Sequence, residues 1–60
     1  HASAMILVHN HPSGDPTPSA ADIAMTKRVA AALATLEVAL HDHAIVGRNH
    51  VLSMRSSGHL

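Results

Sequence analysis

The chain has 60 residues, lacks cysteine, phenylalanine, tyrosine and tryptophan, and has no net formal charge, because four basic residues balance four acidic ones. This length fits one small domain or part of one, and no disulfide can stabilise it. The lack of basic excess and of stacking rings argues against a nucleic-acid partner. No apolar run could span a bilayer and no signal peptide precedes the first one, so we expect a cytoplasmic protein with no membrane partner.

The first predicted element is a strand from Met5 to about His9, preceded by a lead-in of residues 1–4. Its Met-Ile-Leu-Val run is apolar on both faces, which is typical of a strand in the centre of a sheet. Residues 10–18 are rich in proline and contain a glycine, so they predict a loop. Loops of this length often carry functional residues.

A long helix is predicted next, from about Ala20 to Val38. Ser19 is a suitable N-cap, and Asp22 follows it at the spacing of a capping box. Apolar side chains recur at helical spacing and are predicted to face a sheet. They are Met25, Val29, Ala32, Leu33, Leu36 and Leu40.

Two short strands are predicted near the end of the chain, at residues 44–46 and 50–54, with a hairpin turn at 47–49. The polar residues 41–43 are predicted to precede the first of them. The fold class is therefore α/β, as a strand-helix-strand-strand unit whose first two strands are joined by a long crossover.

The strongest chemical signal is the pair His9 and His11. Side chains two positions apart on a strand share a face, so the two imidazoles can converge. The start of the helix can bring the Ser19 hydroxyl and the Asp22 carboxylate back over them. Two imidazole nitrogens, one carboxylate and an open fourth position are typical of a catalytic zinc site. Without the histidines, Ser19 and Asp22 would indicate only the start of a helix.

The segment from His9 to Asp22 follows the pattern His-x-His-Pro-x6-Ser-x2-Asp, and in this it resembles the metal motif of the JAMM (MPN-plus) metalloprotease superfamily. Ile23 and Thr26, and the later Asp-His-x-Ile-Val-Gly segment at residues 42–47, are similar to its bacterial RadC-like branch. The resemblance covers almost the whole chain. It implies an α-β-α sandwich of the JAMM/MPN (cytidine-deaminase-like) type, with residues 1–60 as a partial domain that lacks the N-terminal half.

By this resemblance, His9, His11 and Asp22 bind a zinc ion, and Ser19 hydrogen-bonds the oxyanion formed during cleavage of a peptide or isopeptide bond. The family also takes a general-base glutamate from an earlier strand, and no residue here matches it. Glu37 is the only glutamate, and it lies about 22 Å along the predicted helix from Asp22. The resemblance therefore implies a zinc-binding metallopeptidase domain that is inactive as this chain alone.

A different class of function remains open, namely a non-catalytic binding or scaffold module of a RadC-like protein, a family historically linked to DNA repair. An upstream glutamate on an apolar strand would favour the enzyme. Asp15 is interpreted as a turn-forming residue rather than as a base. For His41, Asp42 and His43, a second metal cluster and a solvated strand entry both remain possible.

We also expect the chain to associate with another copy of itself or with another segment of the protein. The chain opens directly before a strand and has few large apolar side chains, which indicates a piece of a larger domain. Exposed strand edges and apolar strand faces invite pairing. We therefore expect a homo-oligomer, or pairing with an N-terminal segment that these residues do not include.

Overall fold

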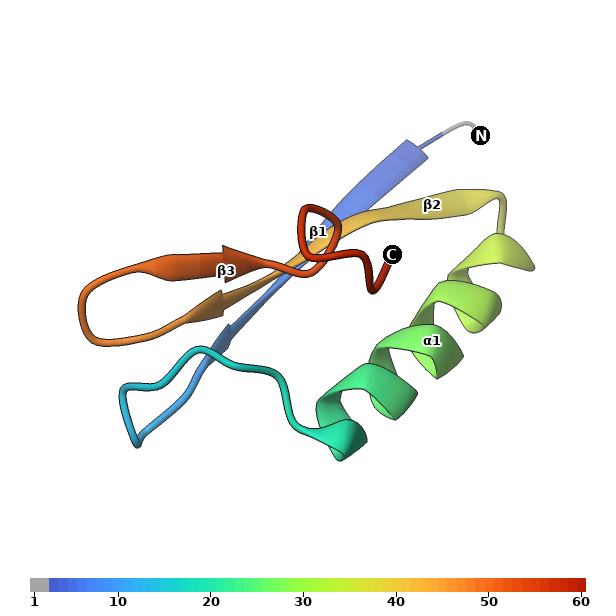
Figure 1. Cartoon of the computed structure of the whole chain (residues 1–60). Helices are drawn as coiled ribbons and strands as arrows, with labels where there is room; N and C mark the ends of the chain where they lie inside the picture. Colours follow the sequence, from blue (N-terminus) through green and yellow to red (C-terminus); the bar gives the residue numbers. More distant parts are fainter. Residues whose placement is uncertain (1–2) are drawn as a thin grey trace.

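A computed structural model describes residues 3–60. It contains a strand β1 (Ser3–Asn10), a helix α1 (Ala20–Ala34), and two further strands, β2 (Val38–Val46) and β3 (Val51–Ser53). The predicted α/β class and the order strand, helix, strand, strand are confirmed. The described residues form two layers, with α1 alongside a three-stranded sheet (Figure 1). No helix among these residues is long and apolar enough to cross a membrane.

The sheet has the order β1-β2-β3, with β1 parallel and β3 antiparallel to β2. In the register of β1 and β2, Leu7 lies opposite His43 and His9 lies opposite Ile45. Alternation along each strand places these four side chains on one face. This face is the one against α1, because the His43 ring is hydrogen-bonded to a helix residue, Thr26.

In the described residues β2, and not β1, is the central strand, so the prediction of a central first strand is wrong for this part of the chain. Val8 is 70% exposed and Ile6 is 56% exposed. Both residues point away from α1, and no other described element covers that face. The apolar run therefore predicts a strand correctly but does not predict its position in this sheet.

The helix ends at Ala34, four residues before the predicted end at Val38. Three successive i→i+3 hydrogen bonds close its last turn, and Glu37 then adopts the left-handed conformation with φ 58°. This conformation turns the chain into β2, which begins at Val38. Neither glycine nor proline marks this end in the sequence, so the apolar periodicity predicts too long a helix.

The second strand is correspondingly longer than predicted and includes the whole His41-Asp42-His43 segment. The register with β1 shifts by one residue here: Met5 lies opposite Leu40, but the next residue, Ile6, lies opposite Asp42, so His41 is skipped. The side chain of His43 is buried, whereas His41 is exposed. The interpretation of these residues as a solvated strand entry is therefore wrong, and they do not gather into one cluster.

The predicted apolar face of the helix is also partly wrong. Leu36 is 72% exposed and Met25 is 41% exposed, whereas Thr26 is fully buried beside Met54. The reason lies at the start of α1, where the capping box turns the Asp22 side chain toward β1. Thr26, one helical turn later, follows it inward.

Candidate metal centre

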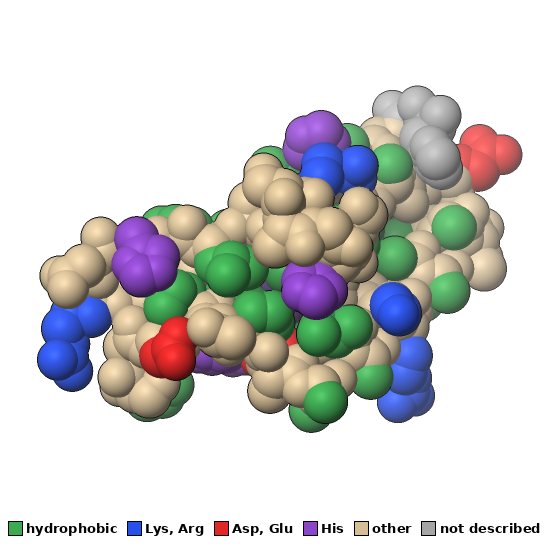
Figure 2. Space-filling model, viewed as in Figure 1, with side chains coloured by type: hydrophobic (Ala, Val, Ile, Leu, Met, Phe, Trp, Pro, Cys, Tyr) green, Lys and Arg blue, Asp and Glu red, His purple; other side chains and the backbone are tan. Residues whose placement is uncertain are grey.

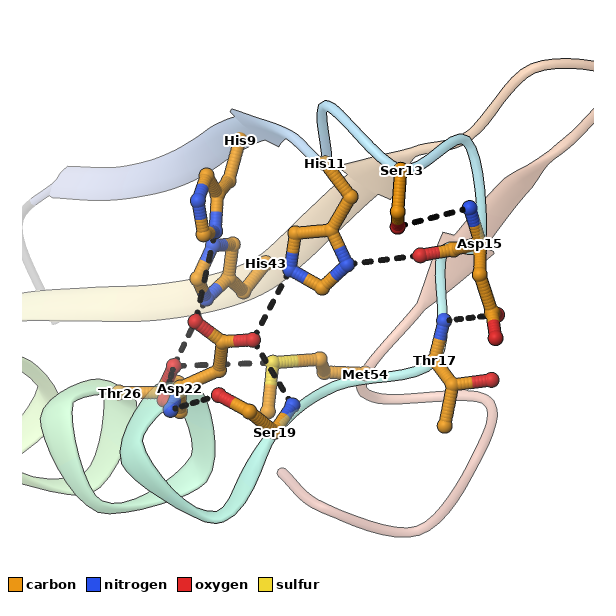
Figure 3. Close-up of polar contacts among 10 residues, drawn as sticks. All are labelled: His9, His11, Ser13, Asp15, Thr17, Ser19, Asp22, Thr26, His43 and Met54. Carbon is orange, nitrogen blue, oxygen red and sulfur yellow. Dashed lines mark hydrogen bonds and ion pairs between the residues drawn. The ribbon is translucent and has the colours of Figure 1, made fainter.

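The predicted site residues meet where β1 ends and α1 begins (Figure 3). His9 lies near the end of β1, and His11 follows the strand directly. At the start of the helix, Ser19 and Asp22 form the predicted capping box. The Asp22 N–H donates to the Ser19 hydroxyl oxygen at 3.0 Å, and the Ser19 N–H donates to Oδ2 of Asp22 at 2.8 Å. The box fixes the carboxylate at the first turn of the helix.

The three predicted metal ligands converge on one point. One nitrogen each of His9 and His11 and one oxygen of Asp22 lie within 4.8 Å of one another. Nε2 of His11 is 3.0 Å from Oδ2 of Asp22, and Nδ1 of His9 is 3.6 Å from Oδ1. The His9 and His11 rings pack edge to face, 4.8 Å apart. The side chains of His11 and Asp22 are mostly buried, at 15% and 12% exposure.

The surroundings of His11 determine which ring nitrogen can bind a cation. Its Nδ1 lies 2.8 Å from the backbone carbonyl of Asp15, which only accepts hydrogen bonds, so Nδ1 carries the hydrogen. In a neutral ring Nε2 then has a lone pair, and this lone pair faces the carboxylate of Asp22. Two acceptors at 3.0 Å repel each other unless a proton or a metal ion lies between them.

His9 provides a second indication. Its Nδ1 is buried and has no hydrogen-bond partner among the described residues, and 3.6 Å from Oδ1 of Asp22 is too long for a good hydrogen bond. A buried nitrogen without a partner is costly, so it needs an explanation. A cation bound by His9, His11 and Asp22 would satisfy this nitrogen and separate the two facing acceptors. The residues present therefore fit a metal ion.

The electrostatic environment keeps the carboxylate charged. The pKa of Asp22 is lowered mainly by the backbone N–H of Ser19, and further by the Ser19 hydroxyl and His11, against a partial opposing effect of burial. The pKa of His11 is raised, first by the backbone carbonyl of Asp15 and then by the Asp22 carboxylate. A negative charge thus lies beside two imidazoles, an arrangement that favours a cation or a proton.

The loop between β1 and α1 is anchored to the hairpin that joins β2 and β3. The His11 N–H donates to the carbonyl of Val46 at 3.1 Å, and the Arg48 N–H donates to the carbonyl of Gly14 at 2.8 Å. Gly47 leaves no space between the two segments, since a Cβ there would lie 2.6 Å from the Gly14 oxygen. The hairpin therefore sets the position of the loop that orients His11.

The other carboxylates of the described residues make other contacts, and of these only that of Asp15 lies near enough to His11 to help raise its pKa. Asp15 turns its carboxylate back to accept the Thr17 N–H at 3.0 Å, as expected of a turn former. Asp42 accepts hydrogen bonds from the Ser53 hydroxyl and from the N–H of Arg55. Glu37 lies in the turn beyond the other end of the helix. None of the three is part of the group formed by the two histidines and Asp22.

Sequence reasoning missed the two buried polar residues beneath the centre, Thr26 and His43. Nδ1 of His43 is 2.7 Å from the Thr26 hydroxyl, and the His43 ring stacks on that of His9 at 5.9 Å. Burial, together with the neighbouring His9, lowers the pKa of His43, so the ring is held neutral. The residue types gave a weak signal, because Thr26 and His43 both fall in segments similar to RadC-like sequences.

Comparison with known proteins places the chain among JAB-type domains. The model of the RadC-like JAB domain family matches residues 1–59, and the chain belongs to this family. It is 58% identical over 60 residues to a UPF0758 protein of Ruegeria pomeroyi, and 60% identical over 57 residues to a UPF0758 protein of Rhodobacter capsulatus. These alignments cover 100% and 95% of the chain. The chain spans only about a quarter (27%) of the length of each relative.

Proposed function

We propose that His9, His11 and Asp22 bind one zinc ion and that the chain supplies the metal-binding part of a JAMM-type hydrolase acting on peptide or isopeptide bonds. The observation that carries this proposal is the buried, unpartnered Nδ1 of His9, which points into the same space as Nε2 of His11 and the Asp22 carboxylate. Membership of the RadC-like JAB domain family supports it.

The donor set favours zinc among the common metals. Two imidazole nitrogens and one carboxylate, with a fourth position left open, are typical of catalytic zinc. Magnesium and calcium prefer sites made entirely of oxygen ligands. When bound, zinc would lower the pKa of a water molecule and polarise a carbonyl group.

The protein groups around this centre have definite tasks. The Ser19 N–H holds the Asp22 carboxylate, and the Asp15 carbonyl holds the ring of His11. The Ser19 hydroxyl oxygen accepts the Asp22 N–H, and the hydroxyl also helps to lower the pKa of the Asp22 carboxyl. We assign to its hydrogen the binding of an oxyanion, the role that the family resemblance implies for Ser19.

The proton transfers need a group that the described residues do not supply at the centre. Asp15 and Asp42 use their carboxylates in local hydrogen bonds, and Glu37 lies at the far end of the helix. A peptidase built on this chain therefore takes its acid–base group from elsewhere in the protein. The same observation favours the second candidate function, a metal-binding scaffold module without catalysis.

Pairing of β1 with another strand also remains a proposal. One edge of β1 has no strand partner among the described residues, and its apolar side chains are exposed. Such an edge accepts a further strand readily. Light scattering at high micromolar concentration tests self-association, and a stable monomer would contradict it.

Metal titration by calorimetry tests the proposed metal centre. We expect the protein to bind one zinc ion, and His11→Ala and Asp22→Asn each to weaken binding by about 100-fold or more because each removes a ligand. His41→Ala is the matched control, since it removes an exposed histidine that lies outside the group. Unchanged affinity in His11→Ala would refute the assignment.

A further inference from the structure

His43 lies in the strand beneath the metal centre, and its position calls for an explanation. It is 1% exposed, and Thr26 opposite it on α1 is 0% exposed. Buried polar side chains destabilise a fold unless they are hydrogen-bonded, and an apolar pair of the same shape would pack as well. Two polar residues in the interior of the described residues therefore point to a role other than packing.

The first contact of His43 leads to Asp22. A hydroxyl has one hydrogen, and that of Thr26 is donated to the backbone carbonyl of Asp22 at 2.7 Å. The Thr26 oxygen must then accept from His43, so Nδ1 of His43 carries the hydrogen of this 2.7 Å bond. A continuous chain of hydrogen bonds thus joins His43 in β2 to the residue that provides the carboxylate of the centre (Figure 3).

The second contact of His43 is with His9. No hydrogen bond of the described residues involves the ring of His9, and its Nδ1 approaches Oδ1 of Asp22 only to 3.6 Å, so ring packing is its main support. Two rings provide this support: His11 packs against it edge to face, and His43 stacks on it at 5.9 Å with an angle of 24° between the planes. The Asp15 carbonyl holds the ring of His11 in place. The stacked ring of His43 is then the other support of the His9 ring.

We propose that His43 is a positioning residue of the centre, which fixes the ring of His9 by stacking and fixes Asp22 through the Thr26 hydroxyl. The inference rests on the proposed metal-binding function, because it concerns the same centre. His43 lies opposite Leu7 in the sheet, and so sits beside the strand that carries His9 and on the same face as its ring. It is therefore the one described residue that contacts His9 by its ring and reaches Asp22 through one intervening side chain.

Four variants separate the two contacts. His43→Leu removes both. The double variant Thr26→Val/His43→Phe keeps a ring against His9 but removes the hydrogen bonds to Asp22, and it should fold because both polar partners are replaced together. Thr26→Ser keeps the hydroxyl and should behave as the parent protein. His41→Leu is the control, in the same strand but exposed.

The first readout is independent of metal. In the metal-free protein, NMR couplings and ring signals report the conformation of His9. We expect one fixed ring conformation in the parent protein, in Thr26→Ser, in His41→Leu and in the double variant, and averaging in His43→Leu. A His9 ring that stays fixed in a folded His43→Leu variant would overturn the stacking role, whether or not the protein binds metal.

The second readout is the affinity for Co²⁺ and the visible absorption spectrum of the bound ion. Loss of groups that orient metal ligands typically weakens binding by about 10–100-fold, and we expect this for His43→Leu and the double variant, with a changed spectrum. Thr26→Ser and His41→Leu should stay within about threefold of the parent. If the parent binds Co²⁺ and all variants bind alike with the same spectrum, the positioning role is wrong and the metal centre stands. If the parent binds no Co²⁺, the proposed function fails, and the NMR comparison still decides the role of His43.

Discussion

The ring of His11 is held by the backbone of Asp15, four residues further along the chain, through a hydrogen bond of 2.8 Å from Nδ1 to the carbonyl oxygen. This bond leaves Nε2 facing Asp22, so the loop conformation decides which atom of His11 meets the carboxylate. The loop is held in turn by the hairpin, where Arg48 donates to Gly14. Figure 2 shows histidine side chains at several separate places on one face of the molecule, with hydrophobic side chains between them. Changes in the hairpin should therefore reach the proposed metal centre.

Gly47→Ala tests this connection. A Cβ at Gly47 would lie 2.6 Å from the Gly14 oxygen and 2.7 Å from Cδ of Pro16, so the loop must move. We expect a loss of about 1–3 kcal/mol in the free energy of unfolding, as for overpacked positions, together with weaker zinc binding. Urea unfolding and metal titration measure the two effects.

Gly58→Ala is the control for Gly47→Ala. Gly58 has φ +88°, so alanine is strained there, but a Cβ at this position would have no neighbouring atom within 4 Å. We expect reduced stability with normal zinc affinity. Equal zinc affinity in both variants would show that the hairpin does not orient His11.

Ser19 has two separable roles. Ser19→Ala should lower the free energy of unfolding by about 1 kcal/mol, because it removes the N-cap of α1. Ser19→Gly should cost only about a few tenths of a kcal/mol, since glycine is also tolerated as an N-cap, but it has no side-chain donor. If Ser19 binds the oxyanion, both variants of the whole protein should lose hydrolysis alike, as measured by cleavage of a peptide or isopeptide substrate. Normal hydrolysis in Ser19→Gly would leave Ser19 with its capping role alone.

Glu37→Gly should stabilise the chain. Glu37 has φ 58° in the turn after the helix, and a left-handed conformation costs a residue other than glycine about 1–2 kcal/mol. After allowance for the greater freedom of glycine in the unfolded chain, we expect a gain of about 1 kcal/mol in thermal or urea unfolding. Zinc affinity should not change, and a loss of it would show that Glu37 does contribute to the centre.

Asp42 should contribute to the acid sensitivity of the fold. Partial burial raises its pKa, but hydrogen bonds from Ser53, Arg55 and His43 outweigh this effect and hold the pKa below its ordinary value of 3.8. A carboxyl with a lowered pKa stabilises the fold above the unfolded pKa, and this contribution is lost as pH falls through the folded pKa. We therefore expect Asp42→Asn to flatten the decline in stability below about pH 4. Urea unfolding at several pH values would refute this if both proteins declined equally.

The zinc-loaded chain by itself should have no more than background peptidase activity. A positioned acid–base group typically contributes about 10²–10⁴-fold, and none of the described carboxylates beyond Asp22 lies at the centre. Cleavage of a generic peptide or isopeptide substrate measures this, with Asp22→Ala as the control. Robust activity that disappears in Asp22→Ala would reveal a base among these residues, with Asp15 tested first.

The ligands of the candidate centre were predictable because they are close in sequence. His9 and His11 share a strand face by simple alternation, and the capping box fixes Asp22 relative to the start of the helix. Each of these rules is local. The same holds for the loop after β1 and the hairpin before β3, which proline, glycine and asparagine mark.

The end of the helix and the role of His43 were not predictable in this way. The helix stops because Glu37 adopts a conformation that glycine usually takes, and nothing in the apolar spacing signals it. Thr26 and His43 are 17 residues apart, and their contact depends on the packing of the helix against β2. Such a contact follows from the assembled fold and not from either segment alone.

The parallel pairing of β1 and β2 also has a consequence for how the chain folds. Every paired residue is separated from its partner by 35 or 36 positions, as Ser3 is from Val38 and Asn10 is from Val46. Such non-local pairing folds more slowly than local pairing, because closure of the intervening segment costs entropy before the sheet forms. The helix α1 lies within the segment that joins β1 to β2, and its 15 residues span only about 22 Å along the helix axis. Formation of the helix therefore brings the two strands closer together. Variants that strengthen α1 should therefore accelerate refolding.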